Sequence, residues 1–491
     1  MASTIPENRA RFTRDELVSA TGADCAAFDG EVVGVGTDSR AELQGGVFVA
    51  LKGAHFDGHH FIASAVQRGA RVVIVEEPVE AGRAIVLRVP STLRALGDLG
   101  AFHRRRWGRR VVAVAGSVGK TTTRTAVASL LEAASLDAAL PVFCPKGNLN
   151  NLVGVPMVLL GLSDEHALTV VELGTSIPGE IERLTQISSP DVGILTRIAL
   201  EHSEALGDLD AIEREEGALL AGLAPSAIAI ANLDDARCAA QLELSSAKTR
   251  VGYGLSAAAK YRITRHDSIS AKLTRVCIER PEHGPLDAKS PLLGLPGAYA
   301  VAAAVAATEC LSARPVTLDQ LLAGLASPGL GEPGRLTPVE LPDGCLVLDD
   351  TYNSSPASVL SSLDVARGLA RQRGSRLVLV LGEMRELGTL SKAAHREVGE
   401  GIAKAAPDLV VAFGGDAEGF LEASARLGRS TYFALDALGA LEVVARERQP
   451  GDLILVKASR SLRAERVVQG LLPGALRPLA PQVGRTRGKP A

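Results

Sequence analysis

Short apolar runs rich in valine, isoleucine and leucine recur along the chain and predict buried β-strands. From residue 111 onward, most of these runs alternate with Ala- and Leu-rich segments of helical character. Strands that alternate with helices form βαβ units and parallel sheets, so we expect an α/β protein. The predicted strands lie at residues 47–51, 72–77, 111–116, 168–173, 192–196, 227–233, 346–350, 377–382, 409–414 and 452–457.

Two interruptions of this pattern predict domain boundaries. Near residue 105, the segment FHRRRWGRR is expected to be a basic connector at the surface, and residues 331–340 lie in a stretch dense in Gly and Pro. At roughly 150 residues per domain, a chain of 491 residues fits three domains. We expect a small mixed α/β domain (1–105), a central parallel-sheet domain of the P-loop type (106–332), a Rossmann-like domain (333–480) and a disordered tail (481–491).

Composition narrows the classes of partner. The formal net charge is −3, which gives no overall electrostatic attraction to nucleic acid or to an anionic membrane. Any phosphate must therefore be recognised by a local group of residues. The six cysteines are scattered without a C-x-x-C pair, which argues against a zinc site and fits a reducing cytoplasm. The N-terminus lacks an apolar signal region, and the apolar run at 298–307 is too short to span a bilayer. We expect a cytoplasmic monomer that binds small molecules, without membrane insertion.

A candidate phosphate loop joins the strand at 111–116 to a helix. The segment AGSVGKTT places Gly116 and Gly119 where backbone N–H groups can approach phosphates, with Lys120 near the β- and γ-phosphates and the Thr121 hydroxyl on Mg²⁺. The full G-x-x-x-x-G-K-[ST] pattern is not met, because Val114 stands at its first glycine. The alternative is an ordinary glycine-containing turn between a strand and a helix.

Acidic residues follow two other predicted strands. Glu172 ends the strand at 168–173, where an NTP site needs a metal-binding carboxylate. Asp349 and Asp350 end the strand at 346–350, and a solvated strand end is the alternative for that pair. These features predict a nucleoside triphosphate and Mg²⁺ but do not separate a kinase, a GTPase and a ligase.

Further motifs occur in a fixed order through all three predicted domains. They are TDSR (37–40), GGVFVALKG (45–53), FDGHHF (56–61), AGSVGKTT (115–122), GNLNNLVGVP (147–156), VVELGTSIPGEI (170–181), PDVGILTRIALEHSEALG (190–207), ANLDD (231–235), GRLTPVEL (334–341), LDDTYNSSP (348–356), LGEMRELG (381–388), HREVG (395–399) and VKASRSLRAERVV (456–468). Together they resemble the Mur ligases, most closely the branch that adds D-alanyl-D-alanine.

The resemblance implies ATP-dependent peptide-bond formation in cell-wall precursor synthesis. The carboxylate of UDP-N-acetylmuramoyl-tripeptide would take the γ-phosphoryl group, and the amine of D-alanyl-D-alanine would attack the acyl phosphate. Two alternatives are another amide ligase of the superfamily, such as a folylpolyglutamate type, and a nucleotide-binding relative with altered catalysis. The DSR and DGHHF motifs favour the muramoyl ligase.

The resemblance also assigns site residues by position. It places Lys120, Glu172, His202 and Glu216 in catalysis, with Thr121, Glu172 and His202 at Mg²⁺, and the first domain on the UDP-sugar. A polar helix start, a surface arginine and a turn cap are the alternatives for His202, Arg335 and the DSR segment. The expected nucleotide contacts are Gly116, Ser117, Val118, Gly119, Lys120, Thr121, Thr122, Asn232, Arg335, Asp350 and Tyr352, and the expected substrate contacts are Ser39, Arg40, Asn150 and Asn151.

Several positions depart from the family pattern. Arg197 stands where the family has Asn, Ser176 and Ile177 where it has Asn-His, and Ser355 where it has Asn before proline. The departure with the largest consequence is Glu216, at the position of a lysine that the family carbamylates with CO₂ to bind a second Mg²⁺.

Helical periodicity separates Glu216 from its charged neighbours. Ile212, Leu219, Leu220 and Leu223 form an apolar stripe with Glu216 near its centre, whereas Asp210, Glu213 and Glu215 fit a solvated helix start. An inward carboxylate needs a proton, a partner or a metal. We hypothesise that Glu216 supplies permanently the charge that the carbamylated lysine gains from CO₂, although it reaches roughly 5 Å less. The alternative is an ion pair of Glu216 with Arg197 or another cation.

Overall fold

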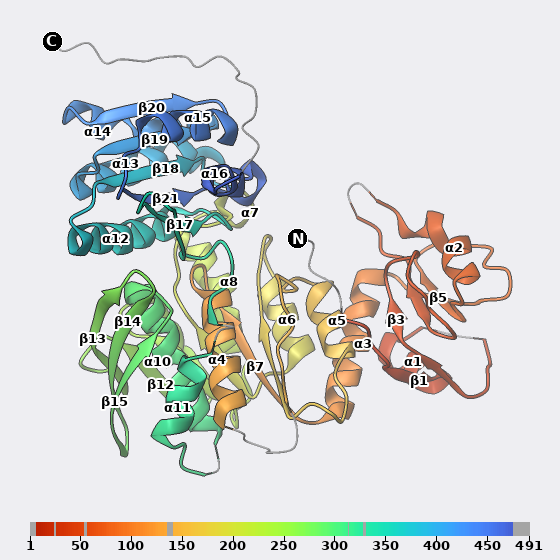
Figure 1. Cartoon of the computed structure of the whole chain (residues 1–491). Coiled ribbons are helices and arrows are strands. Elements are labelled where there is room, and N and C mark those ends of the chain that lie inside the picture. Colours follow the sequence, from red (N-terminus) through yellow and green to blue (C-terminus); the bar gives the residue numbers. More distant parts are fainter. Residues whose placement is uncertain are drawn as a thin grey trace.

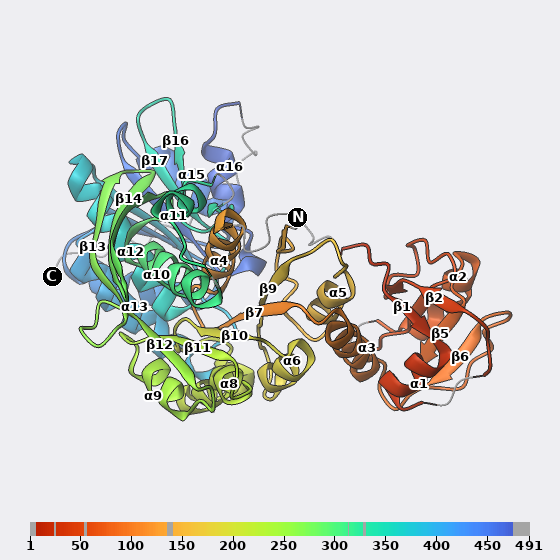
Figure 2. The same ribbon diagram turned by 90° about the horizontal axis from the view of Figure 1, so that it is seen from below.

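The structure is a computed structural model that describes residues 6–23, 26–53, 56–134, 141–312, 314–327 and 330–474. The predicted disordered tail at 481–491 lies outside the described residues. Three groups of elements follow one another along the chain, each built around its own sheet (Figure 1). The C-terminal group lies against the central group, and the N-terminal group extends away from both (Figures 1 and 2).

The N-terminal domain combines a parallel sheet with a short antiparallel ribbon. Parallel β3, β4, β5 and β6 pack beside the pair β1–β2, and α3 carries the chain onward. The bounds are β1 (Arg11–Thr13), α1 (Arg14–Thr21), β2 (Glu31–Val33), β3 (Val35–Gly36), β4 (Val47–Val49), α2 (Ile62–Gln67), β5 (Val72–Val75), β6 (Ile85–Arg88) and α3 (Thr92–Trp107).

The predicted connector near residue 105 is not a surface segment. Residues 102–107 form the last turns of α3, and Arg104 is buried there. Its guanidinium donates to the Ser188 carbonyl at 2.9 Å and to Asp191 at 3.0 Å. The arginine is tolerated inside the protein because these acceptors satisfy its charge. The segment therefore fixes α3 to the central domain.

The central domain is a nine-stranded sheet in the order β15-β14-β13-β12-β11-β10-β7-β9-β8. Strands from β8 to β13 run parallel, and β14 and β15 add an antiparallel meander. The strands are β7 (Arg110–Ala115), β8 (Val142–Phe143), β9 (Leu168–Glu172), β10 (Val192–Leu195), β11 (Ile228–Asn232), β12 (Thr249–Gly254), β13 (Tyr261–Ser270), β14 (Leu273–Arg280) and β15 (His283–Ser290). The helices are α4 (Lys120–Ala134), α5 (Gly154–Leu160), α6 (Glu180–Ser188), α7 (Ser203–Leu206), α8 (Leu209–Ala221), α9 (Ala236–Leu244), α10 (Gly294–Leu311) and α11 (Leu318–Leu325).

One described helix, α10, is long and apolar enough by composition to cross a membrane. It extends the apolar run at 298–307 to 18 residues, of which 67% are buried inside the protein. Its alanines and valines belong to the main core beneath the central sheet, together with residues of α4 and β13. Apolar residues line its whole circumference because neighbours surround it, as is typical of a core helix.

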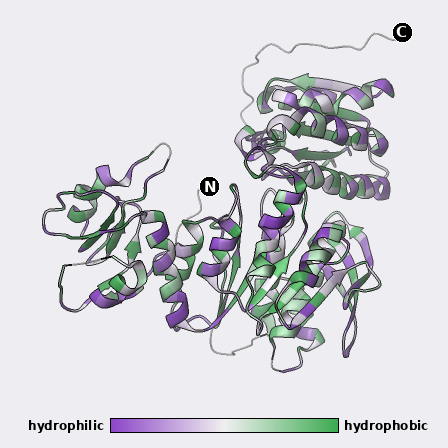
Figure 3. Ribbon diagram, turned by 180° about the vertical axis from the view of Figure 1, so that it is seen from behind, coloured by the Kyte–Doolittle hydropathy of each residue, from purple (hydrophilic) through white to green (hydrophobic). Residues whose placement is uncertain are grey.

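The C-terminal domain has a six-stranded sheet in the order β16-β17-β21-β18-β19-β20, parallel except for β16. Helices cover both faces, and one apolar core lies on each side of the sheet. Green hydrophobic segments run through the strands of both large sheets (Figure 3). The bounds are β16 (Thr337–Glu340), β17 (Leu346–Asp350), α12 (Pro356–Arg373), β18 (Leu377–Gly382), α13 (Ser391–Ala405), β19 (Leu409–Phe413), α14 (Glu422–Arg426), β20 (Ser430–Ala434), α15 (Ala437–Glu447), β21 (Leu453–Lys457) and α16 (Glu465–Leu471).

The predicted fold class is confirmed. Every apolar run that predicted a strand contains one, and the α/β arrangement extends through all three groups of elements. The meander of β13, β14 and β15 was not predicted. Alternate residues of β14 are only partly buried, so this segment lacks the continuous apolar run by which the other strands were recognised.

Candidate functional site

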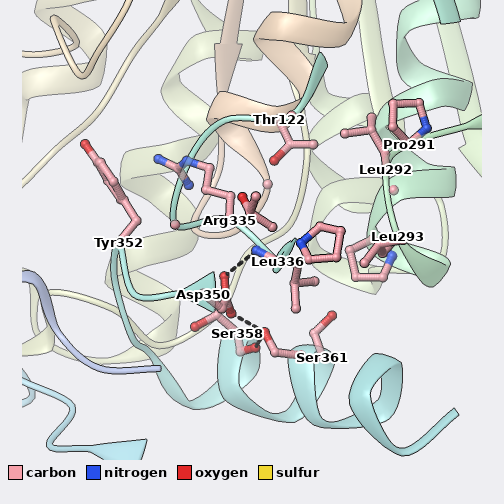
Figure 4. A pocket seen from close by; sticks show the side chains of 18 of the residues that line it. Thr122, Pro291, Leu292, Leu293, Arg335, Leu336, Asp350, Tyr352, Ser358 and Ser361 are labelled. Carbon is pink, nitrogen blue, oxygen red and sulfur yellow. Dashed lines mark hydrogen bonds between the residues drawn. The ribbon is translucent and has the colours of Figure 1, made fainter. Parts of the chain in front are cut away.

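Two cavities lie between the central and C-terminal domains, and residues of the phosphate loop line both. The first, of about 580 Å³, is lined by Ser117, Glu201, Arg335, Asp350 and Tyr352, among others. Figure 4 shows Arg335, Asp350 and Tyr352 from the C-terminal domain lying near Thr122 of α4. The second cavity, of about 860 Å³, is lined by residues of β11 and α12 and by Val118 and Gly119 of the loop. The loop therefore opens toward residues of both domains.

The loop between β7 and α4 has a backbone that only glycine adopts freely. Gly116 has φ 122° and Gly119 has φ 93°, values that L side chains rarely adopt. A Cβ at Gly116 would lie 2.3 Å from Thr196 Oγ1. The loop leads directly into α4, which begins at Lys120, and such a turn at a helix start is suited to phosphate.

Carboxylates surround the Lys120 ammonium. Its Nζ donates to Glu201 Oε1 at 3.2 Å and to the Gly116 carbonyl, and it lies 3.9 Å from Glu216 Oε1. Burial alone would lower the pKa of Lys120, but the charges of Glu201 and Glu216 outweigh burial and raise it to about 12. Lys120 is therefore a permanent cation at the loop. Glu201 was not predicted as a site residue, because its only signal is its place beside His202.

Glu172 and Thr121 are in direct contact, as expected of residues that share a metal. Thr121 Oγ1 donates to Glu172 Oε2 at 2.7 Å, and Asn150 Nδ2 donates to Glu172 Oε1 at 2.9 Å. Burial opposes ionisation of Glu172, but the positive charges of Arg124, Arg335 and Lys120 lower the pKa of this carboxyl. Glu172 is therefore an ionised carboxylate inside the protein.

The expected inward position of Glu216 is confirmed. Its side chain is fully buried, and Oε2 accepts a hydrogen bond from Gly116 N at 2.7 Å. Among the described residues, no group donates to Oε1. Burial and the nearby Glu201 raise the pKa of Glu216 to about 8 against the pull of Lys120. The cation facing Glu216 is thus Lys120, whereas Arg197 lines the second cavity.

The expectation of a solvated Glu215 is wrong. Glu215 is buried, and its carboxylate accepts from Gly179 N at 2.7 Å and from Ile181 N at 2.9 Å. These donors belong to the first turn of α6, whose unsatisfied N–H groups attract a carboxylate. The solvated position holds for Asp210, whereas the Glu213 side chain is only 18% exposed and faces α9; both pair with Arg237.

His202 does not join the other predicted metal ligands. It has φ 49° at the start of α7, and its Nδ1 pairs with Glu386 of the C-terminal domain. In the described ranges, no three His, Cys, Asp or Glu side chains are grouped closely enough to hold a metal ion. The structure therefore brings together Thr121 with Glu172 and Lys120 with Glu216, but leaves His202 with a different partner.

The C-terminal domain contributes a buried ion pair. Lys457 Nζ donates to Asp350 Oδ2 at 2.6 Å, and Leu336 N donates to Asp350 Oδ1 at 3.2 Å. The solvated alternative for Asp350 is therefore wrong. Lys457, which sequence reasoning missed as a site residue, enters from the adjacent strand β21.

Two arginines converge on one aromatic ring. The Arg335 guanidinium lies 4.1 Å from the centre of the Tyr352 ring, and that of Arg460 lies 5.7 Å from it. Arg335 Nε is buried and has no hydrogen-bond partner among the described residues. Arg335 is therefore not a surface arginine, and it retains an unused donor beside the first cavity. Arg460 was not predicted.

The remaining predicted residues lie in several places. Asn232 ends β11 and lines the second cavity, while Asn150 contacts Glu172 as described. Asn151 accepts from Gly154 N at 2.8 Å and thereby supports the start of α5. Ser39 is buried in the N-terminal domain, and the exposed Arg40 pairs with Asp38 of its own turn at 2.7 Å.

The structure shows where the residues that depart from the family pattern lie. Ser176 N and Ile177 N both donate to Glu180, and the Ile177 side chain is exposed. Ser355 is the N-cap of α12 and lines the first cavity, whereas Arg197 lines the second. Arg197 and Ser355 thus line the cavities beside the phosphate loop, whereas Ser176 and Ile177 lie just before α6.

Comparisons with known proteins identify relatives of the chain. Three family models match the chain: the Mur ligase family catalytic domain at residues 31–104, the Mur ligase middle domain at 114–308, and the Mur ligase glutamate ligase domain at 334–460. The UDP-N-acetylmuramoyl-tripeptide--D-alanyl-D-alanine ligase of Escherichia coli (strain K12) is 33% identical over 94% of this chain and 98% of its own length. That of Bacillus subtilis (strain 168) is 30% identical over the same shares.

Solved structures extend the likeness to three dimensions. A crystal structure of MurF from Acinetobacter baumannii has a TM-score of 0.83 and 29% identity, covering 94% of this chain and 99% of that one. MurF ligase from Thermotoga maritima in complex with ADP has a TM-score of 0.76 and 27% identity, covering 89% and 96%. With sequence similarity above 30% across nearly the whole chain, the protein belongs to the Mur ligase family.

Proposed function

We propose that the protein is an ATP-dependent ligase that joins D-alanyl-D-alanine to UDP-N-acetylmuramoyl-tripeptide in cell-wall precursor synthesis. The observation that carries the proposal is the whole-chain similarity to relatives with that activity in their names. The cavities between the central and C-terminal domains are consistent with it, because a ligase must hold two substrates beside one triphosphate.

ATP would bind with its phosphates on the loop from Gly116 to Thr122. The helix start and the Lys120 charge favour the phosphates, and a related structure contains ADP. We assign the remainder of the nucleotide to Asn232, Arg335, Asp350 and Tyr352. Arg335, whose Nε has no hydrogen-bond partner among the described residues, and Tyr352 both line the first cavity, which supports this assignment.

The residues present fit a Mg²⁺ ion at one point and supply part of a second site. Thr121 and Glu172 offer the oxygen ligands that Mg²⁺ prefers, and Glu216 has an oxygen without a donor. We propose that Thr121 and Glu172 hold one ion, and that Glu216 and His202 belong to a second. Bound Mg²⁺ would offset the charge that develops on the phosphates.

Glu216 would be a built-in carboxylate in place of a carbamylated lysine. Its position against Gly116 N and Lys120 places a carboxylate next to the phosphate loop without any need for CO₂. Because the carboxyl is protonated at neutral pH in the ligand-free site, binding of a metal there would release a proton.

The reaction would follow from these charges. Lys120 would draw negative charge from the γ-phosphoryl group as the tripeptide carboxylate attacks it, giving ADP and an acyl phosphate. The D-alanyl-D-alanine amine would then attack the acyl carbon, releasing phosphate and a proton. The C-terminal residues that close the first cavity would keep water from the acyl phosphate.

The domain roles follow the same proposal. We assign residues 1–105 to the UDP-sugar, with Ser39 and Arg40 as contacts, residues 106–332 to ATP, and residues 333–480 to D-alanyl-D-alanine and closure. Asn150 and Asn151 would border the acceptor substrate near Glu172. We further propose that the enzyme acts as a monomer in the cytoplasm, on small molecules alone.

Phosphate release from ATP tests the proposal. It should require both UDP-muramoyl-tripeptide and D-alanyl-D-alanine, and mass spectrometry should show the UDP-muramoyl-pentapeptide. Release that is independent of the dipeptide, or that responds to folate and glutamate instead, would contradict it. Lys120→Met serves as the inactive control.

A further inference from the structure

A contact between the central and C-terminal domains joins residues 202–204 to residues 386–388, and we name it the interdomain latch. His202 Nδ1 pairs with the Glu386 carboxylate. Glu204 N donates to the Glu386 carbonyl at 3.1 Å, and Ser203 Oγ donates to the Leu387 carbonyl at 3.2 Å. Side chains and backbone thus meet within three consecutive residues on each side. Figure 1 shows α7 of the central domain directly beside the C-terminal domain.

Both sides of the latch have unusual backbone conformations. His202 has φ 49° and Glu386 has φ 64°, although neither is glycine. Gly388 has φ 53°, and a Cβ there would lie 3.1 Å from Glu204 Cα. Left-handed backbone at non-glycine residues is strained and is retained when surrounding contacts require it. The two loops are therefore shaped for each other.

The latch follows directly in sequence on Glu201, which contacts the phosphate-loop residue Lys120. His202 follows Glu201, whose carboxylate accepts from Lys120 Nζ at 3.2 Å. Both Glu201 and Ser203 are buried, so the intervening His202 has little freedom to move alone. A shift of Glu386 would therefore move His202, and with it the neighbouring Glu201 that accepts from Lys120.

From this connection we infer that Glu386 is a positioning residue of the ligase. It holds the His202 ring by Nδ1 and orients Nε2, so that the phosphate-loop side of the site takes its working arrangement when the C-terminal domain is seated. The inference rests on the proposed function for its catalytic part. Its structural part, that Glu386 keeps the two domains together, is independent of any activity.

Three variants of the full chain test the inference. Glu386→Asn keeps a residue that tolerates left-handed backbone but shortens the side chain beyond reach of His202. Glu386→Gln keeps the length and an acceptor oxygen. Arg385→Ala is the matched control, because Arg385 is exposed and pairs with Glu383 of its own domain.

The first measurement is the radius of gyration by X-ray scattering without nucleotide, which does not depend on catalysis. Glu386→Asn should increase it, whereas Glu386→Gln and Arg385→Ala should match the native protein. The second is steady-state kinetics, where Glu386→Asn should lower kcat about tenfold with less than a twofold change in KM for UDP-muramoyl-tripeptide. Native scattering together with native kcat in Glu386→Asn would overturn the inference. A native protein without ligase activity would contradict the proposed function alone, and the scattering comparison would still decide the structural part.

Discussion

Replacing Glu216 tests the most unusual feature of the site, a fully buried carboxylate next to the phosphate loop. Glu216→Ala removes the acceptor that Gly116 N uses at 2.7 Å. A buried donor left without a partner costs about 1–3 kcal/mol. Glu216→Gln keeps an acceptor oxygen in nearly the same volume, so its structural cost should be about 1 kcal/mol or less.

The electrostatic part of the effect of replacing Glu216 comes from its interaction with Lys120. Once Glu216 ionises, as it would on binding a metal, its charge lies 3.9 Å from Lys120 Nζ, and two unit charges near 4 Å apart attract by about 4 kcal/mol at an effective dielectric constant of 20. Desolvation of the buried carboxylate cancels most of that attraction, so both variants should still fold. If Glu216 is a metal ligand, losing about 3 kcal/mol of transition-state stabilisation would lower kcat by about 100-fold.

The assay is phosphate release with and without added bicarbonate, alongside urea unfolding. Native activity should not respond to bicarbonate. Glu216→Gln should be nearly as stable as the native protein but about 100-fold slower, and bicarbonate should restore neither variant. A native enzyme that needs bicarbonate, or a Glu216→Gln variant with full activity, would show that Glu216 does not replace the carbamylated lysine.

Three further predictions address pH dependence and two buried carboxylates. Because the pKa of Glu216 is raised from 4.5 to about 8, the folded protein binds more protons than the unfolded chain between these values. This carboxyl therefore contributes stability below about pH 4.5 that is lost as pH rises toward 8. In urea titrations from pH 5 to pH 8, the free energy of unfolding of Glu216→Gln should rise relative to that of the native protein. A constant difference between the two proteins would contradict this. Lys457→Met leaves the buried Asp350 without its cation and should cost about 3–5 kcal/mol, seen as a lower melting temperature, whereas exchange of the exposed Lys392 should change nothing. Glu215→Ala should cost about 1–2 kcal/mol by uncapping α6 while leaving kcat within about twofold; a large fall in kcat at native stability would show a direct role.

Local pattern was enough to predict much of the fold and the phosphate loop. Parallel strands buried on both faces are continuous apolar runs, and the inward position of Glu216 follows from helical periodicity alone. Glu215 was misjudged because periodicity describes one helix, whereas its burial depends on the N–H groups of α6. The Lys457–Asp350 pair depends on two strands far apart in sequence that lie side by side in the sheet.

Dependence on residues far apart in sequence also explains why the contact of His202 was not predicted. Its sequence neighbours and the family resemblance point to a metal, but its observed partner Glu386 lies in another domain. The packing of the central domain against the C-terminal domain decides which residues lie opposite α7. The antiparallel meander was missed for a related reason, because its half-exposed strands have a mixed composition that no single window distinguishes from loops.

Formation of product from the two substrates tests the proposed ligase activity most directly. Purified protein would be incubated with ATP, Mg²⁺, UDP-muramoyl-tripeptide and D-alanyl-D-alanine, and the reaction followed by mass spectrometry together with phosphate release. We expect one UDP-muramoyl-pentapeptide and one phosphate per ATP consumed, with neither product in the Lys120→Met variant. ATP hydrolysis without pentapeptide, or no turnover from a folded native protein, would contradict it.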